Sequence, residues 1–431
     1  MTWLGRYRIR HYLDHSIWVL PALGMAAAVG AVRLLDAVDR PDRGGLDPDT
    51  TRAVLGTMAA SMFTFIVFVS SALLVAVQLA SSMLSPRIIA IVFKDPVTKW
   101  SLTIFVFTFT FSLAALVRVS ATVPMVTAYL AAYSCLASLG VFLYLIDHVG
   151  KALRPSGALW SVAALGREVV ESVYPRLLAD GPAPALAARD LPDLKTARTL
   201  SSRHDGVVLA FDAGGLERLA ERTDCVIELV PQVGDFIAIG DPLFRVYGAA
   251  DRAMDDVLHH SAAVGQERTL EQDPAFAFRV LVDIASKGLS PAINDPTTAV
   301  LALDQIHHLL RAVGRRCLDD EGGRSRAGRL RLLYRTPNWE DYVRLAVTEI
   351  RHFGGTSIQV ARRLRAMLEN LIETLPEERT ALLRQELSLL KRSAERFFTE
   401  PEDRALAEVS DFQGVGGHRG AGAPAQTAAG G

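Results

Sequence analysis

The sequence predicts a mainly α-helical membrane protein with four transmembrane helices, followed by an α+β cytoplasmic region that holds a small β-module and a helical C-terminal part. Half of the 431 residues are hydrophobic, and the apolar excess lies before residue 150, whereas most of the charge lies after it. A helix needs about 20 mostly apolar residues to cross the hydrocarbon core of a bilayer. Four runs approach that length, at residues 16–35, 53–80, 100–117 and 124–146. The last three contain no Asp, Glu, Lys or Arg, which is rare in the core helices of soluble proteins.

The charges that flank these runs predict their orientation, because short basic loops stay in the cytoplasm. An acidic stretch, residues 36–49, separates the first run from the second. Basic residues precede the first run, separate the second from the third and follow the fourth, at Arg6, Arg8, Arg10, Arg87, Lys94, Lys99, Lys151, Arg154 and Arg167. We therefore expect residues 1–150 to form the multi-pass domain of a bacterial inner (plasma) membrane protein with both termini in the cytoplasm.

The first run allows a second interpretation. A basic start, an apolar stretch and the small residues Ala26–Ala28 also fit a cleaved signal peptide. The length of the stretch, and the polar pair Asp14 and His15 directly before it, favour a span. Ahead of this run, aromatic residues and arginines mix between residues 3 and 13, which predicts an amphipathic helix that anchors the first span at the membrane interface.

Polar but uncharged side chains within the spans are the candidates for a pore lining. The second span carries Ser71 and Gln78 and is followed by Ser81. Hydroxyl groups in such helices also bond to their own backbone or to a neighbouring helix, so packing is the alternative explanation. The lack of carboxylates in the last three spans argues against a proton-relay transporter but leaves a hydroxyl-lined pore possible.

An interfacial motif follows the second span. It consists of Ser85, Pro86 and Arg87. Proline stops or bends a helix, and the arginine can extend to lipid phosphates. We therefore expect these residues at the cytoplasmic membrane surface.

After the spans, changes in composition predict four regions. They are a cytoplasmic helix and linker at 151–200, a small β-rich module at 201–250, a helical cytoplasmic domain at 251–400 and a disordered tail at 401–431. In the module, turns at Gly234 and Gly240 join short strands with the spacing of half a biotinyl/lipoyl-type hairpin. No lysine stands at the hairpin tip, so we expect no cofactor. The C-terminal helices carry a basic face made of Arg351, Arg362, Arg363 and Arg365. We expect this face to be solvated, and contact with anionic lipid headgroups is the alternative.

The segment between residues 273 and 310 predicts two helices joined by a polar corner. Pro291 and Pro296 bracket Asn294 and Asp295, so the chain cannot remain helical there. Asp295 can cap the next helix, with Pro296 at its first position. In this interpretation, which we favour, the corner only joins two helices. The alternative is a polar site made of Asp283, Lys287, Ser290, Asn294, Asp295, Asp304 and His308.

Several classes of function are excluded or disfavoured by totals and spacing. The 46 basic and 47 acidic residues nearly cancel, so no global basic field attracts nucleic acid. The three cysteines stand far apart and predict neither a zinc site nor a disulfide framework. Asp304 and His308 share a helix face at a spacing that suits a metal, but packing is the simpler explanation, and we expect no metal. No nucleophile elbow, P-loop or HExxH motif occurs, which disfavours an enzyme.

Two groups of motifs resemble those of a known family. They are Gln78-Leu79-Ala80-Ser81 with Ser85-Pro86-Arg87, and Val282-Asp283-Ile284-Ala285 with Leu289-Ser290-Pro291 and Ile293-Asn294-Asp295-Pro296-Thr297-Thr298-Ala299. Together they resemble the bacterial family of predicted membrane proteins called domain of unknown function 2254 (DUF2254). The resemblance runs from the first span to about Phe398, with Ala292 where the family usually has Gly. It implies a membrane location and this architecture, and no particular activity.

Three classes of function remain. The first is an oligomeric channel or pore regulated by its cytoplasmic domain, with the lipid bilayer and further copies of the chain as partners. The second is a membrane-anchored sensor or scaffold that acts through another protein. The third is a membrane enzyme that uses the corner at Asn294 and Asp295. Spans that are rich in hydroxyl groups and free of charge favour the channel.

Overall fold

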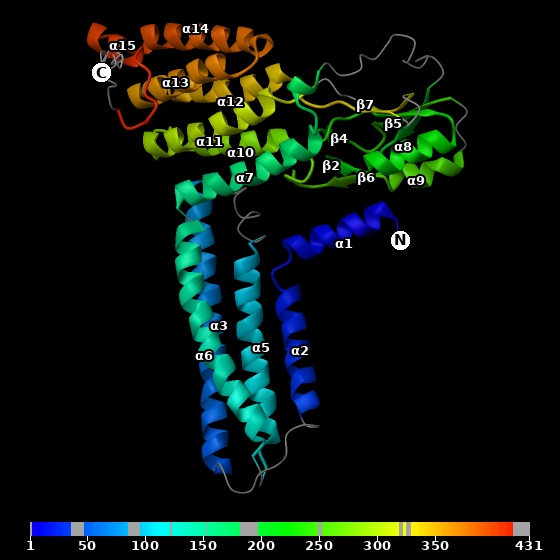
Figure 1. Cartoon of the computed structure of the whole chain (residues 1–431), viewed down its shortest axis with the longest axis vertical. Coiled ribbons are helices and arrows are strands. Elements are labelled where there is room, and N and C mark those ends of the chain that lie inside the picture. Colours follow the sequence, from blue (N-terminus) through cyan, green and yellow to red (C-terminus); the bar gives the residue numbers. More distant parts are fainter. Residues whose placement is uncertain are drawn as a thin grey trace, which may run out of the picture. The chain divides into compact units, whose positions relative to one another are not determined.

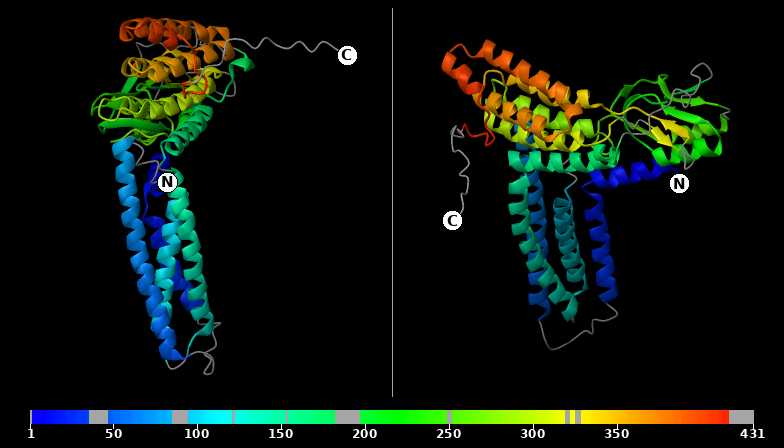
Figure 2. Two further views of the ribbon diagram at one scale, coloured as in Figure 1. Left: turned by 90° about the vertical axis from the view of Figure 1, so that its left-hand side faces the viewer. Right: turned by 45° about the horizontal axis from the view of Figure 1, so that its top comes forward.

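The structure is a computed structural model of the whole chain. It describes residues 2–35, 47–84, 95–120, 123–152, 154–181, 197–248, 252–318, 322–324 and 329–416. Two compact units form: the helical unit, Arg8–Ala158, and the sheet-containing unit, which joins Met1–Tyr7 to Leu159–Gly431. Figure 1 labels the elements of both units, and Figure 2 shows each unit from two further directions.

The helical unit consists of long apolar helices. After the end of α1 (Trp3–His15) come α2 (Val19–Leu35), α3 (Pro48–Met83), α5 (Pro96–Arg118) and α6 (Met125–Ala152). Helix α5 packs against α2, α3 and α6 and so forms the centre of the unit (Figure 1). Asp95 begins α5 by accepting a hydrogen bond from the Thr98 amide (2.9 Å), with Pro96 in the first turn, where no intrahelical amide bond is lost.

Three of these helices are long and apolar enough to cross a membrane: Pro48–Leu79, Pro96–Arg118 and Met125–Ala152. They confirm helices at the second, third and fourth predicted spans. The first predicted span differs, because α2 has only 17 residues and a bend of 81° separates it from α1. Together α1 and α2 form a broken pair that passes the same test of length and composition.

Basic side chains cap the C-terminal ends of two helices in this unit, where backbone carbonyl groups have no hydrogen-bond partner within the helix. At the end of α1, Lys99 Nζ donates to the carbonyl oxygens of Leu13 (3.1 Å) and Asp14 (2.5 Å). After α5, Arg52 Nη2 donates to the carbonyl oxygen of Val119 (2.9 Å). Lys99 is only 5% exposed. Lys99 therefore stabilises the C-terminal end of α1, and Arg52 stabilises the C-terminal end of α5.

The sheet-containing unit starts within α7 and continues to the end of the described chain. Its first part contains α7 (Pro155–Val173), η1 (Leu178–Asp180), β1 (Arg198–Ser201), β2 (Gly206–Phe211), α8 (Ala213–Arg222), β3 (Val226–Leu229), β4 (Phe236–Ile237), β5 (Pro242–Tyr247), η3 (Arg252–Met254), α9 (Asp255–His259) and β6 (Ala262–Gly265). Its second part contains α10 (Pro274–Gly288), α11 (Pro296–Gly314), β7 (Gly322–Arg324), β8 (Leu330–Leu333), α12 (Trp339–Phe353), α13 (Ile358–Thr374), η4 (Glu377–Arg379), α14 (Thr380–Phe397) and α15 (Pro401–Ala407).

The strands form two small sheets, with the orders β1-β5-β3-β8-β7 and β4-β2-β6. All pairs are antiparallel except β3 and β8, where Ile227 lies opposite Leu332. The region predicted as a β-module, 201–250, thus supplies only part of the sheets, and β6, β7 and β8 complete them from later in the chain. The physical reason is that short strands leave unpaired edges, which further strands cover.

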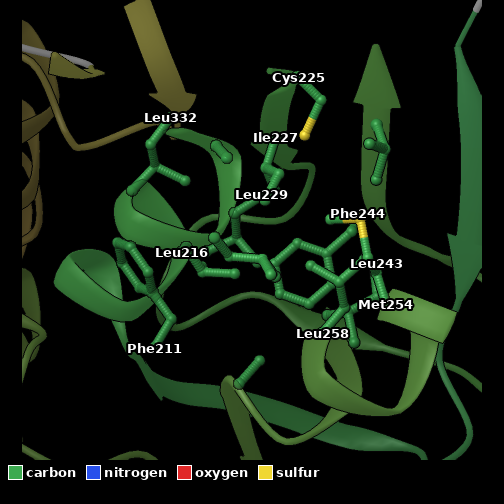
Figure 3. Packing of buried hydrophobic residues seen from close by; sticks show 14 of the residues in the cluster. Phe211, Leu216, Cys225, Ile227, Leu229, Leu243, Phe244, Met254, Leu258 and Leu332 are labelled. Atoms are coloured by element: carbon green, nitrogen blue, oxygen red, sulfur yellow. The ribbon is translucent and has the colours of Figure 1, made fainter. Parts of the chain in front are cut away.

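One hydrophobic cluster fills the space between these strands and α8 (Figure 3). Phe244, Ile227 and Leu216 are each fully buried in it. Leu332 of β8 enters the same cluster, so the β-rich part and the later chain share one core. Cys225 is buried there as well and acts as a small apolar side chain.

The C-terminal end is ordered further than the sequence predicts for a disordered tail at 401–431. Pro401–Ala407 form α15, and the segment that follows lies against α13. Asp411 is 3% exposed and accepts three backbone hydrogen bonds from the residues after it. Arg362 of α13 donates from Nε to a backbone carbonyl of the same segment (3.0 Å). Residues 417–431 lie outside the described part.

Candidate functional site

The predicted polar corner is a closely bonded loop between α10 and α11. The carboxylate of Asp295 accepts hydrogen bonds from the amide (3.0 Å) and the hydroxyl (2.6 Å) of Thr298. The Asp295 amide donates to the carbonyl oxygen of Gly288 (2.7 Å). These bonds are those of a helix N-cap, and they fit the interpretation of the corner as a joint between two helices.

The neighbouring candidates also shape this turn. Asn294 is exposed and has a φ of +50°, a left-handed conformation that asparagine tolerates better than most residues. The amides of Ile293 (3.1 Å) and Asn294 (2.9 Å) donate to the carbonyl oxygen of Ser290. Ser290 Oγ donates to the carbonyl oxygen of Lys287 (2.7 Å). The structure thus brings Ser290, Asn294 and Asp295 together, with local backbone groups as their partners.

Replacing Asp295 by alanine is expected to lower the free energy of unfolding of the sheet-containing unit by about 1 kcal/mol, because the first turn of α11 loses its cap. Native-state hydrogen exchange of the α11 amides in the full chain measures this change. Thr297→Ala, at the exposed neighbouring position, is the control and should change the value by less than about 0.5 kcal/mol. Unchanged stability together with lost activity would instead indicate a functional site at Asp295.

Asp283 belongs to an ion-pair network between α10 and α12. Arg279 donates from Nε to Asp283 Oδ1 (2.6 Å), and from its two terminal nitrogens to the carboxylate of Glu349 (2.6 and 2.7 Å). The hydrogen bonds from Arg279 keep the pKa of Glu349 below its ordinary value. Such a two-pronged bond fixes the relative orientation of the two helices, so the contacts of Asp283 are structural.

A second polar network joins α11 to α13. Arg363 Nε donates to Asp304 Oδ1 (2.7 Å), and its Nη2 lies 3.3 Å from His307 Nδ1. His307 Nε2 lies 3.0 Å from Asn370 Oδ1. These partners assign the tautomer: Nδ1 accepts from Arg363, and Nε2 carries the hydrogen that Asn370 accepts. Burial, followed by the charge of Arg363, lowers the pKa of His307 to about 4, so the ring is neutral at pH 7.

This network bears on the metal alternative at Asp304 and His308, and it corrects the expectation of a solvated basic face. Asp304 and His308 do not come together as a ligand pair, because Arg363 binds the carboxylate of Asp304 and His308 is exposed. The expectation of a solvated basic face is wrong for Arg351, Arg362 and Arg363, which are 7%, 2% and 6% exposed, and Arg365 is half-buried. Helical spacing in the sequence indicates that Arg363 is buried, because it lies three residues after Val360 and four before Met367. Both of these apolar residues are buried.

The membrane candidates lie on α3. Ser71 and Gln78 are exposed on the helical unit, and Ser81 is half-buried. The two exposed residues continue a stripe of polar side chains, all of them exposed: Thr57, Ser61, Thr64, Ser71 and Gln78. Steps of four, three, seven and seven residues place this polar stripe along one helix face, as in a left-handed coiled coil. Ser85, Pro86 and Arg87 lie outside the described residues.

Hydroxyl groups in the interior of the helical unit belong to α5 and α6. Thr108 and Ser138 share a hydrogen bond (2.9 Å), and Ser138 Oγ donates to the carbonyl oxygen of Ser134 (2.8 Å). Thr108 is 1% exposed and Ser138 is fully buried. Such bonds hold apolar helices together. Interior hydroxyls therefore serve packing, whereas the polar stripe of α3 is left on the surface of the unit.

A small pocket of about 130 Å³ lies at the start of α10. Gln272, one of its lining residues, already bonds both backbone groups of Phe211 (3.0 and 3.2 Å). Asp273 bonds Arg268 (2.7 Å) and caps α10. Ligand pockets usually measure roughly 300–1,000 Å³. The volume and the engaged polar groups indicate a structural gap between the sheet and the helices.

Comparisons with known proteins find similar chains. A family model described as "Predicted membrane protein (DUF2254)" matches residues 14–370. Uncharacterized protein Rv1290c of Mycobacterium tuberculosis and uncharacterized protein Mb1321c of Mycobacterium bovis are each 28% identical to this chain over 428 residues. The match covers 93% of this chain and 80% of each relative. No solved structure matches the chain significantly.

Proposed function

The chain belongs to the DUF2254 family of predicted membrane proteins, and from this premise we propose that it is a multi-pass protein of the bacterial inner membrane with both termini in the cytoplasm. In this proposal α2 is the first span, in addition to α3, α5 and α6. Its 17 residues rise roughly 26 Å, against a hydrocarbon core of about 30 Å. Support for the orientation comes from Arg8 and Arg10 before α2, from Lys151 in the last turn of α6 and from Arg154 after it, because basic flanks remain in the cytoplasm.

We propose further that copies of the chain assemble around α3 to form a pore, with the sheet-containing unit as its regulator. The observation that supports this proposal is the exposed polar stripe of α3. A stripe on the interior of one chain would line a path within that chain. An exposed stripe at coiled-coil spacing instead suits contact with α3 of other copies.

Gln78 is the residue of the stripe on which a pore depends most. Threonine hydroxyls of the stripe can bond within their own helix, as Thr57 does to Ala53 O (2.8 Å) and Thr64 to Ala60 O (3.0 Å). The Gln78 side chain is exposed and forms no hydrogen bond with the described residues. An amide in an apolar surrounding needs a partner, which another copy of α3 or water in a pore would supply.

Gln78→Leu is therefore expected to abolish ion flux through the purified protein in liposomes. Ser70→Leu is the matched control, because Ser70 is an exposed polar residue of α3 that lies off the stripe, and it should keep the flux of the unchanged chain. Flux would be measured under varied voltage, tension and pH. If the unchanged chain conducts and the Gln78→Leu variant conducts equally well, Gln78 does not line the pore.

The second candidate function is a membrane-anchored sensor or scaffold. The hydroxyl bonds of Thr57 and Thr64 within α3 favour it, because they satisfy these groups without a pore. Absence of flux under all three conditions would support this candidate. Cysteine cross-linking at Ser71 then tests assembly and conduction separately. If copies cross-link but show no flux, the assembly around α3 is supported and the conduction is contradicted.

A further inference from the structure

A cavity of the sheet-containing unit lies between the first turns of α1, helix α8 and helix α9, and measures about 690 Å³. Trp3 and Arg6 of α1 form one wall, and α8 and α9 form the others. This volume falls within the range of roughly 300–1,000 Å³ that is usual for ligand pockets.

Packing of α1 against the sheet holds this wall in place. Leu4 is buried against Leu209 of β2 and Ala263 of β6. The Leu4 amide donates to the carbonyl oxygen of His260 (3.2 Å), at the end of α9. Trp3 and Tyr7 stack with ring centroids 5.2 Å apart. The apolar side of this first part of α1 thus covers the sheet, and the anchoring of the first span at the membrane interface stays a prediction.

Three arginines line the cavity: Arg6, Arg218 and Arg222. Arg218 and Arg222 are four residues apart and lie on the outer face of α8, because Leu216, Leu219 and Ala220 bury the opposite face. All three arginines are exposed, and none forms an ion pair or a side-chain hydrogen bond with the described residues. Their guanidinium groups are therefore available to a ligand.

The acidic residues of the lining offset these charges only in part. Asp256 forms an ion pair with Arg203 (3.1 Å), and Asp212 caps α8 by accepting from the Gly215 amide (2.9 Å). Glu221 is the remaining carboxylate of the lining. With Asp256 paired to Arg203, the three arginines face the two carboxylates of Asp212 and Glu221, which leaves an excess of one positive charge.

We infer that this cavity binds a phosphate group, through Arg218 and Arg222 with Arg6 opposite. Guanidinium groups match the geometry of phosphate oxygens. The first turn of α1, the positive end of its dipole, lines the same space and adds to the attraction. Trp3, Leu219 and Val257 provide apolar surface beside the charges, which suits a phosphate that carries an apolar part.

Two sources of such a phosphate are distinguishable, a lipid headgroup and free phosphate. A lipid headgroup carries acyl chains, which Trp3, Leu219 and Val257 would contact, whereas free phosphate would bind the arginines alone.

The test uses the full chain in dodecyl maltoside, a detergent without phosphate, with short-chain phosphatidic acid as the first probe and inorganic phosphate as the second. Binding is followed by tryptophan fluorescence, and the signal should disappear in Trp3→Phe. The double variant Arg218→Gln/Arg222→Gln should weaken binding at least about tenfold. The double variant Arg344→Gln/Arg392→Gln removes two exposed arginines elsewhere in the same unit and should bind as the unchanged chain does.

Each outcome decides the inference. Tight binding of phosphatidic acid alone, weakened by the cavity variant, supports a lipid headgroup as the ligand. Equal binding of inorganic phosphate, weakened by the same variant, supports the cavity with free phosphate as its ligand. The inference is overturned if neither probe binds, or if the cavity variant and the control variant bind equally well. Circular dichroism of both variants verifies that the fold is intact.

Discussion

Replacing Arg351 by methionine is expected to lower the free energy of unfolding of the sheet-containing unit by about 3–5 kcal/mol. Arg351 of α12 and Glu386 of α14 form an ion pair of 3.2 Å, with side chains only 8% and 6% exposed. Without the arginine, Glu386 would remain buried with its charge uncompensated, and that cost exceeds the net contribution of the intact pair. Native-state hydrogen exchange of the α12 and α14 amides in the full chain measures the change.

The same helix provides a matched control for this prediction. Arg344 of α12 pairs with Glu340, but both side chains are more than half exposed, at 64% and 53%. Arg344→Met should therefore cost less than about 1 kcal/mol. The double variant Arg351→Met/Glu386→Leu should recover most of the loss, because an apolar pair leaves no buried charge. Equal losses for Arg351→Met and Arg344→Met would contradict the account.

Phe244→Ala is expected to destabilise the same unit by about 3–5 kcal/mol. Phe244 is fully buried in the cluster shown in Figure 3. Truncation loses the burial of the ring and leaves a cavity, which the surrounding structure fills only partly. Hydrogen exchange should detect the loss in β3, β5 and β8 together, because Leu332 of β8 shares this core.

The control for this substitution is a phenylalanine on another strand. Phe236 of β4 is 69% exposed, so Phe236→Ala should change stability by less than about 0.5 kcal/mol. If β8 kept its protection while β3 and β5 lost theirs in Phe244→Ala, then the local strands and the later chain would not form one cooperative core.

Helix starts are the features that the sequence predicts best, because a cap needs only neighbours within one turn. Asp273 and Asp295, each followed by proline, begin α10 and α11 as expected, with the carboxylate accepting from the amide three residues later. Long apolar helices follow from composition for a similar reason, since about 20 consecutive uncharged residues are enough to identify them. The last three predicted spans therefore appear as helices close to their expected bounds.

The sequence could not predict which residues far apart in the chain would contact one another. Arg363 appears there as part of a basic helix face, and only the packing of α13 on α11 brings it to Asp304 and His307. Likewise the sequence did not predict a strand at β8, which pairs with β3 about 100 residues before it. Side-chain type and spacing state what a residue can bond, but not which of many compatible partners lies within reach.

The sequence by itself determined the apolar helices, the capped corner and the polar side chains of α3. Only the tertiary structure decided that these polar side chains lie on the exposed face of the helical unit, and that Arg6 lines the same cavity as the distant pair Arg218 and Arg222. The physical reason is that periodicity distinguishes the faces of a helix from one another. What covers each face depends on the packing of elements that are distant in sequence, whose energies no single segment contains.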